Sequence, residues 1–224
     1  YREAYFNYAP YAKHAIITNI EWDHPDYYPK FKDMIKSYSK FIQKLPKGAN
    51  LYVYGYDKDI DEALDMAARD DISVQRYGFG EGFDIQIKNV KHGKGKNNFE
   101  IFQDGKSRGV YELIIPGDHN ILNATAAISV CLNLGVDPKK IRDILKTFKG
   151  LNRRFEVYGT VNGVTVIDDY AHHPTALDVT LAAAKQFYPD SRIWCVFQPH
   201  TFSRTKALFE EFAKSFNNAD FVII

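Results

Sequence analysis

Residues 164–174 read Val-Thr-Val-Ile-Asp-Asp-Tyr-Ala-His-His-Pro, and this stretch decides the fold class that the sequence predicts. Its first four residues are apolar or β-branched, which is typical of a buried parallel strand. The strand then stops in titratable side chains. In an open α/β sheet, ligands bind in the crevice beyond the carboxyl ends of the strands. The stretch therefore predicts an α/β fold with a binding site at this strand end.

Five titratable side chains follow the predicted strand: Asp168, Asp169, Tyr170, His172 and His173. Adjacent aspartates on a strand point to opposite faces, so we expect one to face a ligand and the other to orient a neighbour or cap the next helix. In a purely structural interpretation, the aspartates only end the strand and cap the helix. The tyrosine and the histidine pair favour a functional site.

Outward from this stretch, hydrophobic periodicity and turn residues predict alternating strands and helices. Strands are expected at residues 15–20, 51–54, 74–79, 83–90, 99–102, 109–115, 155–161, 164–167, 192–197 and 221–224, and helices at 31–45, 60–68, 121–134, 138–148, 176–186 and 205–216. The strands 83–90, 99–102 and 109–115 read as an antiparallel meander beside a mostly parallel sheet. Residues 149–155 read as a linker, which predicts two domains, 1–150 and 151–224.

The composition excludes several classes of protein. Lys and Arg number 29 against 28 Asp and Glu, so no basic field exists for nucleic acid or an anionic membrane. No apolar run approaches the roughly 20 residues of a membrane span. Cys131 and Cys195 lack metal-ligand spacing and are expected to be buried free thiols in a reducing compartment. The chain starts without a signal peptide or an initiator methionine and ends mid-strand, so we expect a piece of a larger protein.

Two further groups of polar residues follow predicted secondary structure. Strand 15–20 leads into Asp23 and His24, which could ligate a hydrated Mg²⁺, although a loop histidine without ligand function is an open alternative. Asn120 and Asn123 are three residues apart at a helix start, so their carboxamides share a face and could meet a nucleobase or ribose. Asn120 could equally cap the helix. The segment 91–96 lacks the Walker spacing and reads as a solvated hairpin tip.

Cationic and imidazole side chains complete the set of candidates. Arg153 and Arg154 in the linker offer guanidinium groups for phosphate or carboxylate, or for ion pairs between domains. His200 and Arg204 follow strand 192–197, where they could bind a carboxylate and an amino-acid substrate. Because these clusters follow strand ends in both predicted domains, the sequence predicts an active site between the domains.

These motifs resemble those of the Mur ligase family, and among its members the ligases that join L-alanine to UDP-N-acetylmuramate. The resemblance covers the whole chain. It rests on residues 18–24 (Thr-Asn-Ile-Glu-Trp-Asp-His), 117–124 (Gly-Asp-His-Asn-Ile-Leu-Asn-Ala), 153–155 (Arg-Arg-Phe), 168–174 (Asp-Asp-Tyr-Ala-His-His-Pro) and 197–205 (Phe-Gln-Pro-His-Thr-Phe-Ser-Arg-Thr). Phe-Gln-Pro-His in particular separates these ligases from the related enzyme that recycles murein tripeptide.

The resemblance implies a three-domain enzyme of peptidoglycan precursor synthesis in the cytoplasm. This chain would carry most of the central ATPase domain and the first part of a Rossmann-like C-terminal domain. The family reaction uses ATP to phosphorylate the lactyl carboxylate of UDP-N-acetylmuramate, and the amine of L-alanine then attacks the acyl phosphate. Such chemistry needs stabilisation of charge on the phosphoryl oxygens and close positioning of both substrates.

The resemblance also implies roles for individual residues. His24 would be a Mg²⁺ ligand, and His24, Arg154 and His172 would be catalytic. The nucleotide would be bound by Asn120, Asn123, Arg154, Asp169 and Tyr170, and the muramoyl carboxylate and amino acid by His172, His200 and Arg204.

Some features of the family fall outside or depart from this sequence. Its phosphate-binding Gly-Lys-Thr loop, Mg²⁺-binding glutamate and UDP-binding domain would precede Tyr1, so we expect the chain alone to be inactive. Ser39 and Lys40 fall near the point where some relatives carry a carbamylated lysine, and Thr201 stands where some members have Arg. Three alternatives stay open: a murein-peptide recycling ligase, a non-catalytic nucleotide-binding module, and a mononuclear metal hydrolase, for which no three-ligand spacing is present.

Overall fold

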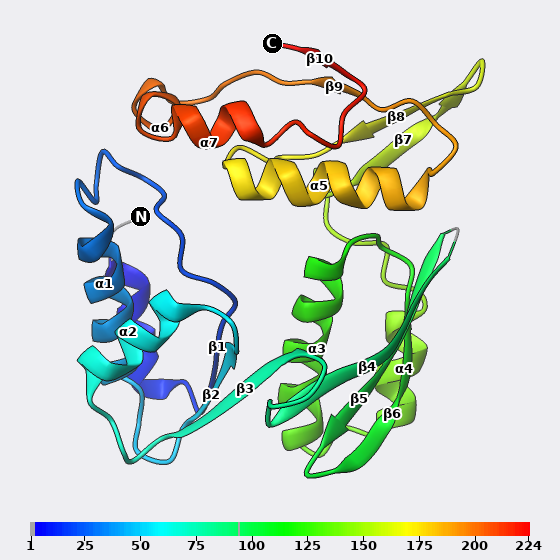
Figure 1. Ribbon diagram of the computed structural model, residues 1–224. Helices are drawn as coiled ribbons and strands as arrows, with labels where there is room; N and C mark the ends of the chain where they lie inside the picture. Colours follow the sequence, from blue (N-terminus) through cyan, green and yellow to red (C-terminus); the bar gives the residue numbers. More distant parts are fainter. Residues whose placement is uncertain (1–2, 94) are drawn as a thin grey trace. The chain divides into compact units, whose positions relative to one another are not determined.

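A computed structural model describes residues 3–93 and 95–224 of the chain (Figure 1). Within these residues the chain forms two compact units. Unit 1 consists of Tyr1–Lys88, Glu100–Gly109 and Leu122–Pro138, and unit 2 of Asn89–Phe99, Val110–Ile121 and Lys139–Ile224. The units are therefore interleaved along the chain.

Helices and strands alternate through most of the chain, as the sequence predicts. The helices are η1 (Glu3–Tyr11, a 3₁₀ helix that no sequence pattern predicts), α1 (Phe31–Gln43), α2 (Lys58–Ala67), α3 (Asp118–Asn133), α4 (Pro138–Leu145), α5 (Pro174–Phe187), α6 (Phe202–Ala207) and α7 (Phe209–Lys214). The strands are β1 (His14–Ile17), β2 (Asn50–Tyr54), β3 (Ser73–Phe79), β4 (Ile85–Gly93), β5 (Lys96–Gln103), β6 (Lys106–Leu113), β7 (Glu156–Val161), β8 (Val164–Asp168), β9 (Trp194–Val196) and β10 (Phe221–Ile223).

The main sheet has the order β1-β2-β3-β4-β5-β6. Strands β1 to β4 pair in parallel, with Ile17 opposite Val53 and Tyr54 opposite Tyr77. Strands β5 and β6 are joined by Asp104 and Gly105, both with positive φ (54° and 69°), which is the geometry of a tight antiparallel hairpin. The predicted combination of a mostly parallel sheet with an antiparallel meander is confirmed.

The hydrophobic core of unit 1 lies between β1, β2, α1 and α2. Figure 1 shows α1 and α2 next to each other beside these strands. Asp57 begins α2: its Oδ1 accepts hydrogen bonds from the backbone N–H groups of Asp59 (2.9 Å) and Ile60 (3.2 Å). Its Oδ2 accepts a third from the N–H of Ile20 (2.8 Å). One half-buried capping residue therefore also fixes the segment that leaves β1 and leads to His24.

Unit 2 corrects the strand interpretation of residues 164–167. Strand β8 is not a buried parallel strand: it pairs with β7 in an antiparallel hairpin, and Val164 and Val166 are exposed. The connection is Asn162-Gly163, with φ of 50° and 79°. Asn-Gly favours a two-residue turn whose twist matches antiparallel strands, so the chain reverses before any crossover can form.

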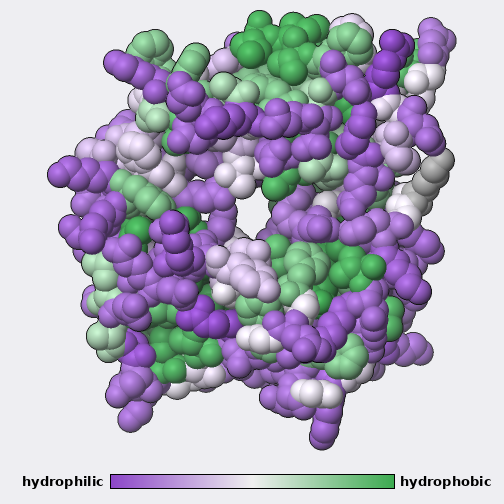
Figure 2. Space-filling view, viewed as in Figure 1, coloured by the Kyte–Doolittle hydropathy of each residue, from purple (hydrophilic) through white to green (hydrophobic). Residues whose placement is uncertain are grey.

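The rest of unit 2 contains α5 and the parallel pair β9–β10. The predicted helix 205–216 is wrong as a single helix, because the chain leaves helical geometry at Leu208 (φ −115°, ψ 31°) between α6 and α7. The kink lets Leu208 and Phe212 both be buried. Figure 2 shows apolar surface gathered over β9 and β10, where Trp194, Val196 and Ile223 are exposed.

Two smaller expectations concern thiols and membranes. Cys131 and Cys195 are both free, but Cys131 is only half-buried, so the expectation of two buried thiols is wrong for that residue. Among the described helices, none combines the length and apolar content that crossing a membrane requires.

Candidate functional site

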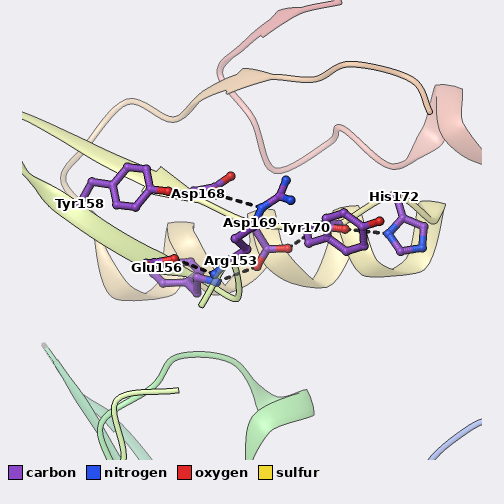
Figure 3. A network of polar contacts seen from close by, with 9 residues as sticks. Arg153, Glu156, Tyr158, Asp168, Asp169, Tyr170 and His172 are labelled. Carbon is purple, nitrogen blue, oxygen red and sulfur yellow. Dashed lines mark hydrogen bonds and ion pairs between the residues drawn. The ribbon is translucent and has the colours of Figure 1, made fainter. Parts of the chain in front are cut away.

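The loop after β8 is organised by the carboxylate of Asp169. Its Oδ2 accepts a hydrogen bond from the backbone N–H of Phe155 (2.8 Å), and its Oδ1 accepts one from the N–H of Ala171 (2.7 Å). Figure 3 shows the side chain between the linker and the loop. Hydrogen bonds from backbone N–H to a carboxylate are among the strong ones. Asp169 therefore ties residues 153–155 to the loop that carries Tyr170 and His172.

Asp168 uses its side chain differently. Its Oδ2 accepts longer contacts of 3.3 Å from the Nε–H of Arg153 and from the hydroxyl of Tyr158. The N-cap residue of α5 is His173 rather than either aspartate, so the helix-capping interpretation of the Asp pair is wrong. Asp169 orients backbone, as expected of one of the two aspartates, and Asp168 meets two exposed side chains.

The linker arginines surround Tyr170. The backbone carbonyl oxygen of Arg153 accepts a hydrogen bond from the backbone N–H of Tyr170 (2.8 Å). The backbone N–H of Arg153 donates to Oε2 of Glu156 (2.7 Å). The guanidinium carbons of Arg153 and Arg154 lie 4.8 Å and 6.0 Å from the centre of the Tyr170 ring. Both contacts are within the range of cation–π attraction. Since Arg153 also holds Asp168, Arg154 is the arginine better placed to meet an added anion.

His172 is held against Tyr170 on the other side. The two rings meet edge to face with centroids 4.8 Å apart, and Nδ1 of His172 lies 2.7 Å from the carbonyl oxygen of Tyr170. A carbonyl only accepts, so we assign the proton of this contact to Nδ1. Nε2 is then the nitrogen that would accept a proton, and it donates to a carboxylate only when both ring nitrogens are protonated.

The loop before α3 places His119 in the same unit. Gly117 has φ of +91°, and a Cβ at this position would lie 2.5 Å from Cε1 of His119. The ring of His119 thus occupies the space that a side chain at 117 would need. Burial lowers the pKa of His119; the charge of Arg154 adds to this, and the carboxylates of Asp169 and Asp118 act in the opposite direction. His119 is therefore favoured as the neutral imidazole.

This lowered pKa predicts a loss of stability in mild acid. Below the ordinary pKa of 6.5, the unfolded chain binds a proton that the folded His119 does not, so the stability falls as the pH drops through the window below 6.5. The slope contributed by one group is at most about 1.4 kcal/mol per pH unit. Thermal unfolding of the full-length protein at pH 7.5, 6.5 and 5.5 should show a shallower dependence in His119→Asn than in the wild type. His200→Asn, which removes an exposed histidine, is the control, and equal slopes for both variants would contradict the prediction.

Asn120 and Asn123 both lie in the first turns of α3. The side-chain nitrogen of Asn120 donates to the carbonyl oxygen of Pro116 (2.7 Å), and Asn123 is exposed. One N–H of Asn120 is thus used by the protein, and its oxygen and second N–H are the groups with which a nucleobase could pair. The carboxamides offer the donors and acceptors that a nucleotide base pairs with.

His24 follows β1 in unit 1, in the left-handed backbone region (φ 56°). Asp23 accepts the backbone N–H of His24 at its Oδ1 (2.7 Å), and its Oδ2 lies 3.3 Å from Nε2 of the His24 ring. Among the described residues, no group of three or more His, Cys, Asp or Glu side chains could hold a metal ion. Asp23 and His24 are fewer than the three protein ligands of a catalytic zinc site, whereas a Mg²⁺ ion that keeps most of its waters needs only one or two.

His200 and Arg204 lie at the start of α6 in unit 2. Arg204 is buried, and its Nη1 donates to the carbonyl oxygen of His200 (3.3 Å). Thr201, between them, has φ of 65°. Arg204 thus fixes the turn that presents His200, whose side chain is exposed.

Strained backbone coincides with three of the sequence-predicted stretches. His24, Arg153, Phe155 and Thr201 all have positive φ without being glycine. Such conformations cost about 1–3 kcal/mol each and persist only where the surrounding structure holds the backbone in place. Strained residues of this kind are common at functional sites. Turn residues such as Asn162 adopt the same region at lower cost.

The structure brings together many of the predicted site residues and adds others. Arg153, Asp168, Asp169, Tyr170 and His172 form one network in unit 2 (Figure 3). His24 and Asn123 belong to unit 1, and His200 and Arg204 make their own contacts on α6.

Sequence reasoning assigned no role to Glu156, Tyr158 or His119. Glu156 stands opposite Asp168 in the β7–β8 register, so recognising the Asn-Gly hairpin would have found it.

Two protein-family models match this chain. The Mur ligase middle domain matches residues 7–131, and the Mur ligase glutamate ligase domain matches residues 153–224. The first match alone covers more than half of the chain.

Curated relatives are similar over the whole chain. It is 43% identical over 225 residues to UDP-N-acetylmuramate–L-alanine ligase of Clostridium botulinum (strain Loch Maree / Type A3), covering 100% of this chain and 48% of that protein. It is 41% identical, with the same coverage, to the enzyme of that name from Clostridium acetobutylicum. The chain thus spans about half the length of the curated relatives it matches.

Solved structures give the same fold. UDP-N-acetylmuramate-alanine ligase MurC of Thermotoga maritima has a TM-score of 0.76 at 25% identity, over 98% of this chain and 46% of that one. MurF ligase of the same organism, solved in complex with ADP, has a TM-score of 0.75 at 21% identity, over 94% of this chain and 48% of that one. The second likeness bears on the fold alone.

Proposed function

The chain belongs to the Mur ligase family, and from that premise we propose that the protein containing it is an ATP-dependent ligase that joins L-alanine to the lactyl carboxylate of UDP-N-acetylmuramate. The observation that carries this proposal is the 43% identity with a ligase of that name, which extends over the entire chain. The carboxylate takes the terminal phosphoryl group of ATP to give an acyl phosphate and ADP. The amine of L-alanine then displaces phosphate to form the amide.

The chemistry supplied by bound ATP and Mg²⁺ is activation of the carboxylate and neutralisation of phosphoryl charge. The protein's own residues position the reactants. We assign Asn120, Asn123 and Tyr170 to the nucleotide, with Asp169 contacting it while holding the loop in place. The exposed guanidinium of Arg154 would meet the phosphoryl oxygens, as a planar fork suits them.

The remaining assignments concern the metal and the two substrates being joined. His24 would contribute a Mg²⁺ ligand, with Asp23 as its carboxylate neighbour. His172 would face the muramoyl carboxylate through Nε2, because its Nδ1 is held by the carbonyl of Tyr170. His200 and Arg204 would bind the amino acid, Arg204 mainly by fixing the turn that presents His200.

Domain organisation and location follow from the same proposal. We propose a central ATPase domain over residues 1–150 and the first part of a C-terminal domain over residues 151–224, which is the division that the two family matches favour. The proposed nucleotide substrates belong to the cytoplasm.

The test is phosphate release from ATP by the full-length protein with UDP-N-acetylmuramate and Mg²⁺, with and without L-alanine. We expect release that depends on both substrates, and mass spectrometry should detect the alanyl product. Release that ignores L-alanine but responds to a murein tripeptide would replace the proposal with the recycling ligase. Nucleotide binding without release under any combination would favour a non-catalytic module.

A further inference from the structure

Asn97 on β5 carries a polar side chain that is fully buried, with 0% of the residue exposed. Its Nδ2 donates to the carbonyl oxygen of Ile115 (3.0 Å), and its Oδ1 lies 2.9 Å from Nδ1 of His92 on β4. Since Nδ2 is the donor to Ile115, Oδ1 is the acceptor of the second bond, so the Nδ1 of His92 carries the proton. Both ends of the buried amide are thereby satisfied.

His92 continues the chain of contacts to the start of α3. Its Nε2 lies 3.4 Å from Oδ1 of Asp118, the first residue of that helix. Asn97, His92 and Asp118 all belong to unit 2. The contacts therefore run from the inside of a hairpin to the loop that precedes Asn120.

That loop is held by two hydrogen bonds: the side-chain amides of Asn97 and Asn120 donate to the carbonyl oxygens of Ile115 (3.0 Å) and Pro116 (2.7 Å). His92 adds a contact with the Asp118 carboxylate, which is an ion pair only when both ring nitrogens are protonated. A buried amide contributes little net stability, but leaving one of its partners unpaired is destabilising, because a buried polar group then has neither water nor protein to bond to. Such a group restricts the loop to the one arrangement that satisfies it.

We propose that Asn97 and His92 are positioning residues for the nucleobase: acting through the segment 115–120, they hold Asn120 where it distinguishes adenine from other bases. This inference rests on the proposed function, in which Asn120 meets the base. Neither residue contacts the nucleotide. Their role is to keep the loop from adopting positions in which the Asn120 carboxamide would pair equally well with guanine.

The test measures binding of ADP and of GDP to the full-length protein by calorimetry. Asn97→Leu keeps the number and branching of the side-chain heavy atoms but removes both hydrogen bonds, and we expect it to reduce the preference for ADP over GDP by about tenfold. His92→Gln, at a partly exposed position that should tolerate it, is expected to reduce the preference by about threefold. In steady-state assays, KM for ATP should rise while KM for L-alanine stays unchanged.

Two controls make the outcome decisive. Lys96→Ala, on the same strand as Asn97, removes an exposed ion pair with Glu112 (2.9 Å) and should leave the base preference intact.

Asn120→Ala should abolish the preference. If Asn120→Ala abolishes it while Asn97→Leu and His92→Gln keep it, the inference is overturned and the proposed function stands. If Asn120→Ala itself keeps the preference, the assignment of Asn120 in the proposed function is wrong. Should Asn97→Leu fail to fold, His92→Gln alone decides.

Discussion

Replacing Asp169 with Asn in the full-length protein is expected to lower ligase turnover by about a hundredfold or more. The amide keeps one acceptor oxygen but turns an NH₂ group toward one of the two backbone N–H groups, those of Phe155 and Ala171, that the carboxylate now satisfies. An unpaired N–H costs about 1–3 kcal/mol, and the loss of a charge-assisted bond adds to it. Phe155 is held at φ of 48°, so the strained linker would relax and carry Arg154 with it.

The adjacent aspartate offers a matched control with the same change of chemistry. Asp168→Asn weakens two contacts of 3.3 Å, to Arg153 and Tyr158, and the Arg153 side chain is 58% exposed. Such contacts are worth less than about 1 kcal/mol, so turnover should stay within about fivefold of wild type. Rates of phosphate release would be measured for both variants, with circular dichroism to confirm folding. Equal losses in the two variants would mean that negative charge at this strand end matters, and not the two backbone bonds.

The contrast between these aspartates marks where prediction from sequence ends. Alternation along a strand predicts that Asp168 and Asp169 face opposite ways, and it correctly predicts that one of them orients a neighbour. Which one does so depends on where the linker returns, because the donors are backbone N–H groups at Phe155 and Ala171. Every residue except proline has a backbone N–H group, so residue type does not show which of these groups are donors to Asp169. No sequence pattern therefore identifies Asp169 as their acceptor.

Strand β8 shows a different cause of error. The run 164–167 has the composition of a buried parallel strand, and the sequence around it alternates strands and helices. The local signal Asn162-Gly163 outweighs this context, since two residues with positive φ close an antiparallel hairpin. The parallel strands β1 to β3 were predictable because they are separated by α1 and α2, and α1 has a clear 3.6-residue periodicity.

Hydrogen bonds between polar groups that are far apart in the chain are the part of the structure that the sequence does not predict. His92 and Asn97 flank a turn that reads as a solvated hairpin tip, and that reading holds for the exposed residues 91–93, while Lys94 lies outside the described residues. Asn97 is nevertheless completely buried, and its Nδ2 donates to the carbonyl oxygen of Ile115, 18 residues further along the chain. The sequence of the strand that carries Asn97 does not identify so distant a backbone partner.

Replacing Gly117 with Ala in the full-length protein is expected to weaken ADP binding by roughly tenfold or more and to lower the unfolding temperature. Gly117 has φ of +91°, a conformation that costs an L residue about 1–3 kcal/mol. The new methyl group would also lie 2.5 Å from Cε1 and 2.7 Å from Nδ1 of His119, and 3.1 Å from Cβ of Ala183. The ring must therefore move, and the first turn of α3 with Asn120 moves with it.

The contribution of the His119 ring can be separated from that of backbone strain. Gly163→Ala places a methyl group at a similar φ of +79°, in a turn with nothing within 4 Å, so it should cost backbone strain alone. The double variant Gly117→Ala/His119→Ala removes the ring that the methyl group meets. If the clash is the cause, the double variant will unfold at a higher temperature than the sum of the two single effects predicts, because the substitutions are coupled. The opposite outcome is that the changes in unfolding temperature add exactly and that Gly163→Ala lowers this temperature as much as Gly117→Ala does. The whole effect would then come from the left-handed backbone conformation, and His119 would contribute nothing to it.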